Sequence, residues 1–219
     1  MKKIILLALA AASVAAFALP ASAMAIVPVH VVPKPEGVKT VDGVGSATLT
    51  GLGTTITCAK SHGTATFTTT TTGTFEQTFS ECVNGSGKKC TTSGQAVGVI
   101  TTATLEFHLA TVEDTTTKAI GPGLLVTPPA GGFATFLCEG GINTTVSGNG
   151  LIGTITQPAC GSSSKEATIS FSSSSSTVQT HKTLAGTATE WSLNAFGFPA
   201  SEDAHGTITL GTEAKLECT

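Results

Sequence analysis

The sequence predicts an all-β protein, folded as a single antiparallel β-sandwich or partly closed barrel of roughly a dozen short strands. Three observations lead to this prediction. The 219 residues include 40 Thr, 25 Gly and 19 Ser, and β-branched Thr suits a strand better than a helix. Apolar and polar residues alternate with a period of two between Gly-containing turns. Charged residues make up only 11% of the chain, too few to cover exposed helices.

The first 23 residues have the three parts of a secretory signal peptide, predicted as a cleaved N-terminal helix. Lys2 and Lys3 supply a positive start, the stretch 4–19 is apolar, and the small residues 21–23 form a cleavage site. We therefore expect a protein that is exported and secreted.

Residues 24–45 are interpreted as an extended leader, and residues 46–219 as one secreted β domain. Pro28, Pro33 and Pro35 in the leader lack the backbone N–H that a regular ladder needs. From residue 46 onward the alternating pattern begins and continues to the end of the chain.

The clearest strand of the domain covers Ala96 to Leu109, where apolar positions such as Val97, Leu105 and Phe107 alternate with polar ones. Its length predicts a bulge or bend near residues 101–102. Shorter strands are predicted around residues 49, 56–58, 65–67, 75–79, 133–138, 144–147, 151–156, 167–171, 187–193, 206–210 and 213–218.

The charge pattern argues against two classes of partner. Without the signal peptide the chain has nine Lys, no Arg and fourteen Asp and Glu, a net charge of −5, and it lacks the basic stripe that binds phosphates. We expect no nucleic-acid partner. No second apolar run is long enough to cross a membrane, so we expect no membrane span in the mature chain.

Several segments resemble a group of uncharacterised secreted proteins of soil actinobacteria. The resemblance covers roughly residues 46–156 and rests on these segments: 56–58, 79–82, Cys90 with 93–94 and 98–100, 133–138, and 146–148 with 152–155. It implies export and an all-β body, with no assigned activity. Cys160 and Cys218 are not part of that pattern.

The six cysteines all follow the signal peptide, so we expect three disulfides formed in an oxidising compartment. Six cysteines allow fifteen pairings, and spacing favours Cys82–Cys90, because the short Asn- and Gly-containing loop between them brings the sulfurs together. Cys58–Cys138 would then join two core strands and leave Cys160–Cys218.

Two groups of side chains are candidates for function. One local set, Glu202, Asp203 and His205, could share a proton and so serve as the catalytic group of a hydrolase. A solvated turn before a strand explains the same residues. A second set, Trp191 with the aromatic side chains of residues 196 and 198, could stack on a sugar ring, or Trp191 could fill the core beside Leu193.

No other motif supplies chemistry. The glycines of 148–153 resemble a dinucleotide fingerprint, but a strand and Pro158 follow where that fold needs a helix. We expect no cofactor, no metal and no catalytic residue. The leading hypothesis is a secreted, disulfide-stabilised, non-enzymatic protein that interacts with an extracellular protein or polysaccharide outside the cell or at its envelope. The alternatives are a carbohydrate-binding module using Trp191, Phe196 and Phe198, and a hydrolase using Glu202, Asp203 and His205.

Overall fold

The computed structural model describes residues 29–51, 53–114, 117–130, 132–175, 178–179, 181–183 and 191–218. These residues form strands and turns without a helix, which confirms the predicted all-β class. None of them belongs to a helix that could span a membrane. The predicted signal peptide, residues 1–23, lies outside the described residues.

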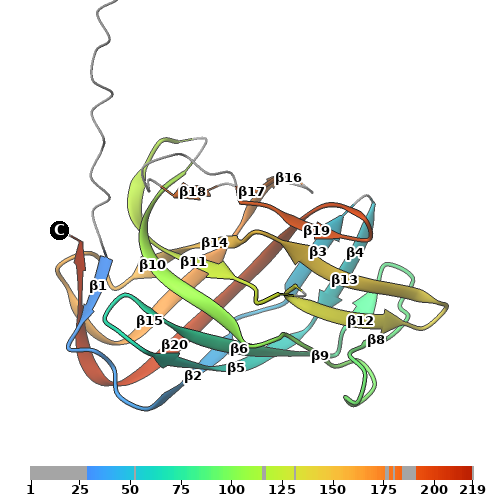
Figure 1. The fold of residues 1–219 in the computed structure, drawn as a ribbon, viewed down its shortest axis with the longest axis horizontal. Coiled ribbons are helices and arrows are strands. Elements are labelled where there is room, and N and C mark those ends of the chain that lie inside the picture. Colours follow the sequence, from blue (N-terminus) through green and yellow to red (C-terminus); the bar gives the residue numbers. More distant parts are fainter. Residues whose placement is uncertain are drawn as a thin grey trace, which may run out of the picture.

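The larger part of the sheet is a ring of antiparallel strands (Figure 1). In the order of the ring they are β2 (Val38–Gly43), β5 (Lys60–Phe67), β6 (Thr72–Ser80), β10 (Leu105–Asp114), β11 (Ile120–Thr127), β14 (Leu151–Gln157), β15 (Ser163–Phe171) and β20 (Phe198–Cys218). Each strand pairs with the next, and β20 pairs with β2. β1 (Val29–Val32) pairs with the C-terminal end of β20.

A second group of strands continues from one end of this ring, so the fold is not a simple closed barrel. It contains β3 (Ala47–Gly51), β4 (Thr54–Cys58), β7 (Val83–Asn84), β8 (Cys90–Thr91), β12 (Ala134–Cys138), β13 (Ile142–Gly148) and β19 (Leu193–Ala195). β20 joins the two groups, because residues 200–203 pair with β3 and residues 204–209 pair with β15. The remaining strands are β9 (Ile100–Thr101) beside β6, β18 (His181–Thr183) beside β10, and the pair β16 (Ser173–Ser175) and β17 (Val178–Gln179).

The predicted strand from Ala96 to Leu109 is wrong over residues 96–99, which belong to no strand and where Val97 is 73% exposed. The remainder is divided into β9 and β10. In β10 the alternation is as expected, since Leu105 and Phe107 are buried while Glu106 is exposed. The ladder breaks over residues 102–104, where the chain changes partners: the N–H of Thr102 bonds to β6 and that of Ala103 to Phe133. This interruption lies next to the predicted bend, and it separates β9 from β10.

Most of the described residues that were assigned to an extended leader belong to the sheet instead. Residues 29–43 contain β1 and β2, and β2 lies between β5 and β20. Pro33 and Pro35 are compatible with these strands because they fall in the connection between them, where no ladder bond is required.

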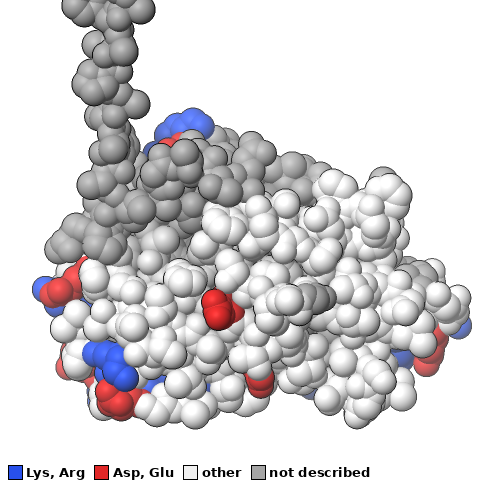
Figure 2. Space-filling model, viewed as in Figure 1, with Lys and Arg blue, Asp and Glu red and all other residues white. Residues whose placement is uncertain are grey.

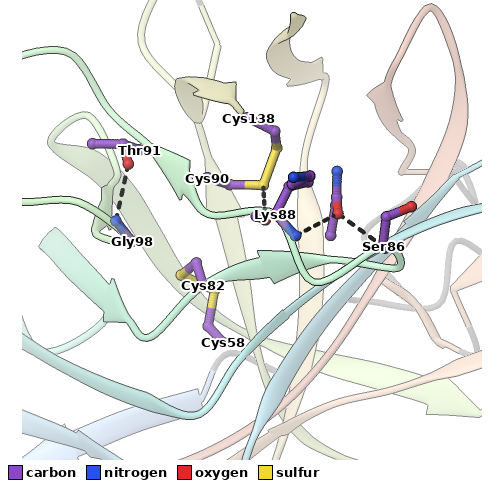
Figure 3. Close-up of a disulfide and its surroundings, with 9 residues drawn as sticks. Cys58, Cys82, Ser86, Lys88, Cys90, Thr91, Gly98 and Cys138 are labelled. Carbon is purple, nitrogen blue, oxygen red and sulfur yellow. Dashed lines mark hydrogen bonds between the residues drawn. A yellow bond between two sulfur atoms is a disulfide. The ribbon is translucent and has the colours of Figure 1, made fainter. Parts of the chain in front are cut away.

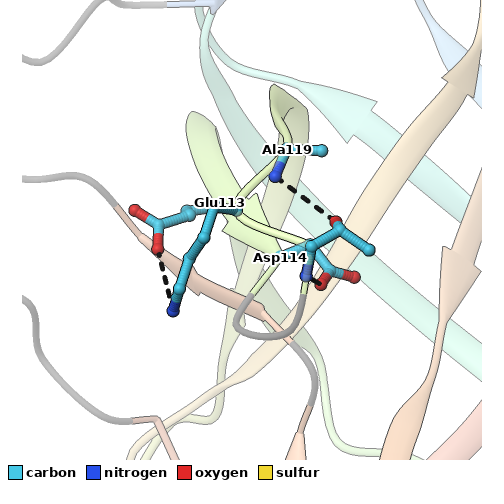
Figure 4. Close-up of polar contacts among 5 residues, drawn as sticks. Glu113, Asp114 and Ala119 are labelled. Carbon is cyan, nitrogen blue, oxygen red and sulfur yellow. Dashed lines mark hydrogen bonds and ion pairs between the residues drawn. The ribbon is translucent and has the colours of Figure 1, made fainter.

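The turn from β10 to β11 is held by polar contacts (Figure 4). The carboxylate of Asp114 accepts a hydrogen bond from the Thr117 N–H at 2.6 Å, and Asp114 and Ala119 are bonded through their backbones at 2.9 Å. Lys118 Nζ lies 3.7 Å from Glu113 Oε1. These contacts support the register of β10 against β11.

The structure contains three disulfides. The two drawn in Figure 3 differ from the predicted pairs. The structure joins Cys58 to Cys82 and Cys90 to Cys138, so the predictions of Cys82–Cys90 and Cys58–Cys138 are wrong. Cys160 is joined to Cys218, the pair that remained in the sequence analysis.

The physical reason for the error lies in strand register. The short loop does bring the backbones of Cys82 and Cys90 together, since the Cys90 N–H bonds to the Cys82 carbonyl at 3.1 Å. Cys90, however, lies directly opposite Cys138 in the β8–β12 ladder. Thr57 lies opposite Val83 in the β4–β7 ladder, and one step further Cys58 meets Cys82.

Candidate ligand-binding cavity

The outer surface offers few charged groups to a ligand on the face shown in Figure 2, where uncharged residues cover most of the area. Thr residues account for part of this surface. Thr40 and Thr64 are paired and exposed on neighbouring strands, and Thr66 is paired with Thr74. The clearest concentration of unusual chemistry lies in the interior.

Two cavities of about 90 Å³ each lie among the core side chains. The first is inside the ring, where Phe67, Phe107 and Leu124 are among its walls. The second lies between the end of the ring and the added strands, with Ile56 and Leu193 among its walls. Both are lined mainly by apolar side chains.

Five residues line both cavities and therefore mark the junction between them: Phe75, Gln77, Phe79, Phe171 and Glu202. Three of these are aromatic and come from β6 and β15. The other two, Gln77 and Glu202, are the polar residues of the junction.

The alternation of β20 places Glu202 inside. Ala200, Ile208 and Leu210 are buried at positions of the same parity, whereas Asp203 and His205 are exposed at positions of the opposite parity. The next inward residues after Glu202 are Ala204 and Gly206, both lining the first cavity. Their small size leaves space beside the carboxyl group.

The Glu202 carboxyl group has no hydrogen bond to any residue in the described ranges. Glu202 is half-buried, and its side chain lines both cavities. Burial raises the pKa of Glu202 from 4.5 to about 7, and the negative charge of Asp203 adds to the rise. Near neutral pH the group therefore exists in both protonation states.

Gln77 presents a second unsatisfied group at the junction. It is 5% exposed, and its side-chain oxygen Oε1 has no hydrogen-bond partner. Its backbone is fully engaged, because its N–H donates to Thr102 Oγ1 at 3.0 Å and its carbonyl accepts from the Thr102 N–H at 2.9 Å. These two hydrogen bonds hold the backbone of Gln77 in place, and its side-chain amide lines both cavities.

The predicted hydrolase set does not come together. Glu202, Asp203 and His205 lie inside strand β20 rather than in a turn before it, so Glu202 faces the interior and the other two are exposed. Asp203 accepts hydrogen bonds from the backbone and hydroxyl of Ser173, at 3.1 and 2.9 Å. The His205 side chain makes no hydrogen bond or ion pair with a described residue, whereas its backbone carbonyl accepts a hydrogen bond from the Val44 N–H at 2.8 Å. The residue also contributes to the wall of the first cavity.

The predicted aromatic set has three different environments. Trp191 is half-buried and lies close to Gly150, where an added Cβ would come within 2.5 Å of the indole ring. Phe196 packs edge-on against Phe136 with ring centroids 6.4 Å apart. Phe198 is the most open of the three, with 45% of its surface exposed.

The structure also shows a surface pair that the sequence analysis missed. His62 Nδ1 lies 2.6 Å from Asp42 Oδ1, on neighbouring strands, and both side chains are exposed. An exposed pair of this kind contributes little to the stability of the fold by itself. Within the described ranges, no three His, Cys, Asp or Glu side chains are grouped so that they could hold a metal ion.

The inward direction of each of these two side chains could have been predicted from the alternation, although their meeting could not. Gln77 falls between Phe75 and Phe79 at the same parity of one predicted strand, and Glu202 has the parity of Ile208 and Leu210. The second signal was missed because residues 202–205 were interpreted as a turn. Comparisons with protein-family models, with characterised proteins and with solved structures find no match to this chain.

Proposed function

We propose that this protein is a secreted, non-enzymatic binding protein that encloses a small, mainly apolar molecule in its two interior cavities. The observation that carries this proposal is the pair of 90 Å³ cavities that meet at Gln77 and Glu202. Three disulfides fit a disulfide-stabilised extracellular protein. The resemblance to secreted actinobacterial proteins supports the same location.

The size of the cavities supports occupation by a ligand. Protein interiors are close-packed, with few voids larger than a water molecule. Each cavity here is smaller than the roughly 150 Å³ apolar cavity that takes up benzene, and the two together are larger. An empty cavity also lowers the free energy of unfolding, and at the usual loss per unit of cavity volume each cavity lowers it by about 2 kcal/mol. A bound molecule would recover this stability.

The test is binding of toluene, a neutral apolar probe, followed by NMR chemical shifts of the ¹⁵N-labelled mature protein. We expect saturable shifts confined to residues around the cavities. Ala204→Leu, which fills part of the first cavity, should weaken binding at least about tenfold, and Ala134→Leu tests the second cavity in the same way. Ala59→Leu, at an exposed position, is the matched control. The absence of saturable shifts would refute the proposal.

A second candidate, binding of polysaccharide by aromatic stacking, is favoured by the exposure of Phe198. It is tested by a pull-down on insoluble polysaccharides. Binding that is lost in both Phe198→Ala and Trp191→Ala supports a stacking site, and binding that survives both variants contradicts it.

A further inference from the structure

The junction of the two cavities holds two hydrogen-bond acceptors without a partner among the described residues. Gln77 Oε1 can only accept a hydrogen bond, and it is buried without a partner. The carboxyl group of Glu202 also has no partner in the described ranges, and once ionised it too can only accept. Leaving buried acceptors unpaired is unfavourable, so a molecule that occupies the junction is favoured when it brings donors.

The junction also lacks positive charge. Among the described residues, no Lys contributes to the wall of either cavity, and the chain has no Arg. Apart from Glu202, the titratable side chain in these walls is His205, which is exposed. The nearest other charge along β20 is Asp203, which is negative. A ligand carboxylate would therefore meet repulsion, whereas a cation would neutralise Glu202.

We propose that the ligand is an apolar amine whose ammonium group lies at the junction of the cavities, where it donates hydrogen bonds to the Glu202 carboxylate and to Gln77 Oε1. This inference rests on the proposed function. An ammonium group has three N–H donors, enough for both acceptors. The apolar body of the ligand fills the space between the aromatic walls formed by Phe75, Phe79 and Phe171.

The proposed pairing makes binding depend on pH. The amine binds the ionised form of Glu202, and burial holds the pKa of this group at about 7. An ordinary amine stays protonated up to about pH 10. The affinity should therefore rise about tenfold from pH 6 to pH 8, in proportion to the ionised fraction of Glu202.

The experiment compares three ligands with the same six-carbon body: hexylamine, 1-hexanol and hexanoate. Each is titrated calorimetrically into the mature protein at pH 6 and pH 8. We expect hexylamine to bind at least about tenfold more tightly than the other two at pH 8, and this preference to shrink at pH 6.

Three variants assign the effect to the junction. Glu202→Gln should remove both the preference for hexylamine and its pH dependence. Gln77→Met keeps the bulk of the side chain but removes the acceptor, and should weaken hexylamine severalfold while leaving the binding of toluene, which has no donor, unchanged. His205→Gln should keep the pH dependence, which separates the effect of Glu202 from that of the imidazole in the wall of the first cavity.

The outcomes separate the two proposals. If hexanol or hexanoate binds as tightly as hexylamine at pH 8, or if Glu202→Gln retains the preference, the amine inference is wrong and the binding function stands. If neither toluene nor any of the three ligands binds to the folded protein, both are wrong. A normal thermal unfolding transition shows that each variant is folded.

Discussion

Glu202 of β20 and Gln77 of β6 line the same two cavities, and neither side chain is hydrogen-bonded to a described residue. They come from strands that are not neighbours in the ring, so their meeting depends on its closure. A buried carboxyl group in such a place lowers the stability of the fold once it ionises.

The first prediction is that the stability of the protein falls as pH rises from about 4.5 to about 7, because of Glu202. In this window the unfolded carboxyl loses its proton while the folded one retains it, so the folded state binds more protons and the free energy of unfolding decreases. Glu202→Gln removes this decrease and should be more stable than the natural protein at pH 8, by up to about 3 kcal/mol. Guanidinium unfolding at several pH values measures it.

The control for this prediction is Glu106→Gln, which changes an exposed carboxylate on the outer face of β10. Its unfolding free energy should follow that of the natural protein across the pH range. If the curve for Glu202→Gln were also parallel to that of the natural protein, the assignment of the pH dependence to Glu202 would be wrong.

Local pattern was sufficient to predict many of the strands but not their partners. The alternation of Leu105, Phe107 and Leu109 indicates a half-buried strand wherever it lies, because one face must meet the core. The leader prediction went wrong because Pro33 and Pro35 say nothing of the segments on either side of them. β2 is held between β5 and β20, which are distant in sequence, and no local signal reports that closure.

The site shows the same division between local and long-range information. Sequence alone indicates that Glu202 interrupts an apolar face, once the strand is recognised. It cannot show that Gln77 lines the same space, since that depends on the ring. The disulfides differ for the same reason: loop length predicted that Cys82 and Cys90 lie close together, and cross-strand register chose other partners.

A second prediction concerns the disulfide pairing, which trypsin can test because the chain has Lys88 and Lys89 between two of the cysteines. Without reduction, cleavage should leave peptide 40–60 linked to peptide 61–88 through Cys58–Cys82. A separate species should contain three peptides joined through Cys90–Cys138 and Cys160–Cys218, namely 90–118, 119–165 and 216–219. Mass spectrometry identifies both species, and a link between 61–88 and 90–118 would contradict the structure.

The third prediction is that the Cys160–Cys218 bond stabilises the fold most, because it closes a loop of 58 residues compared with 24 for Cys58–Cys82. In the chain-entropy model its removal costs about 4 kcal/mol. The double variant Cys160→Ser, Cys218→Ser should show this loss in chemical unfolding at fixed pH. Cys58→Ser, Cys82→Ser is the comparison, and a larger loss there would show that native contacts outweigh loop length.

The fourth prediction distinguishes the two phenylalanines of the predicted aromatic set. Phe196 packs edge-on against the buried Phe136, so Phe196→Ala should lower the free energy of unfolding by about 2 kcal/mol. Phe198 is 45% exposed, and Phe198→Ala should change stability by no more than about 0.5 kcal/mol. Equal effects in urea unfolding would mean that the two rings do not differ in packing as described.

The fifth prediction uses two glycines of the same strand, β11. A Cβ on Gly123 would come within 2.6 Å of both γ-methyl groups of Val112 and 2.7 Å from the Gly153 carbonyl oxygen, while a Cβ on Gly121 would have no atom within 4 Å. Gly123→Ala should therefore destabilise the protein by about 1–3 kcal/mol, since β10 and β14 hold the strand from both sides. Gly121→Ala should leave stability unchanged or raise it slightly. Thermal unfolding of the two variants measures the difference, and a Gly123→Ala protein as stable as Gly121→Ala would show that the ring can open at this position.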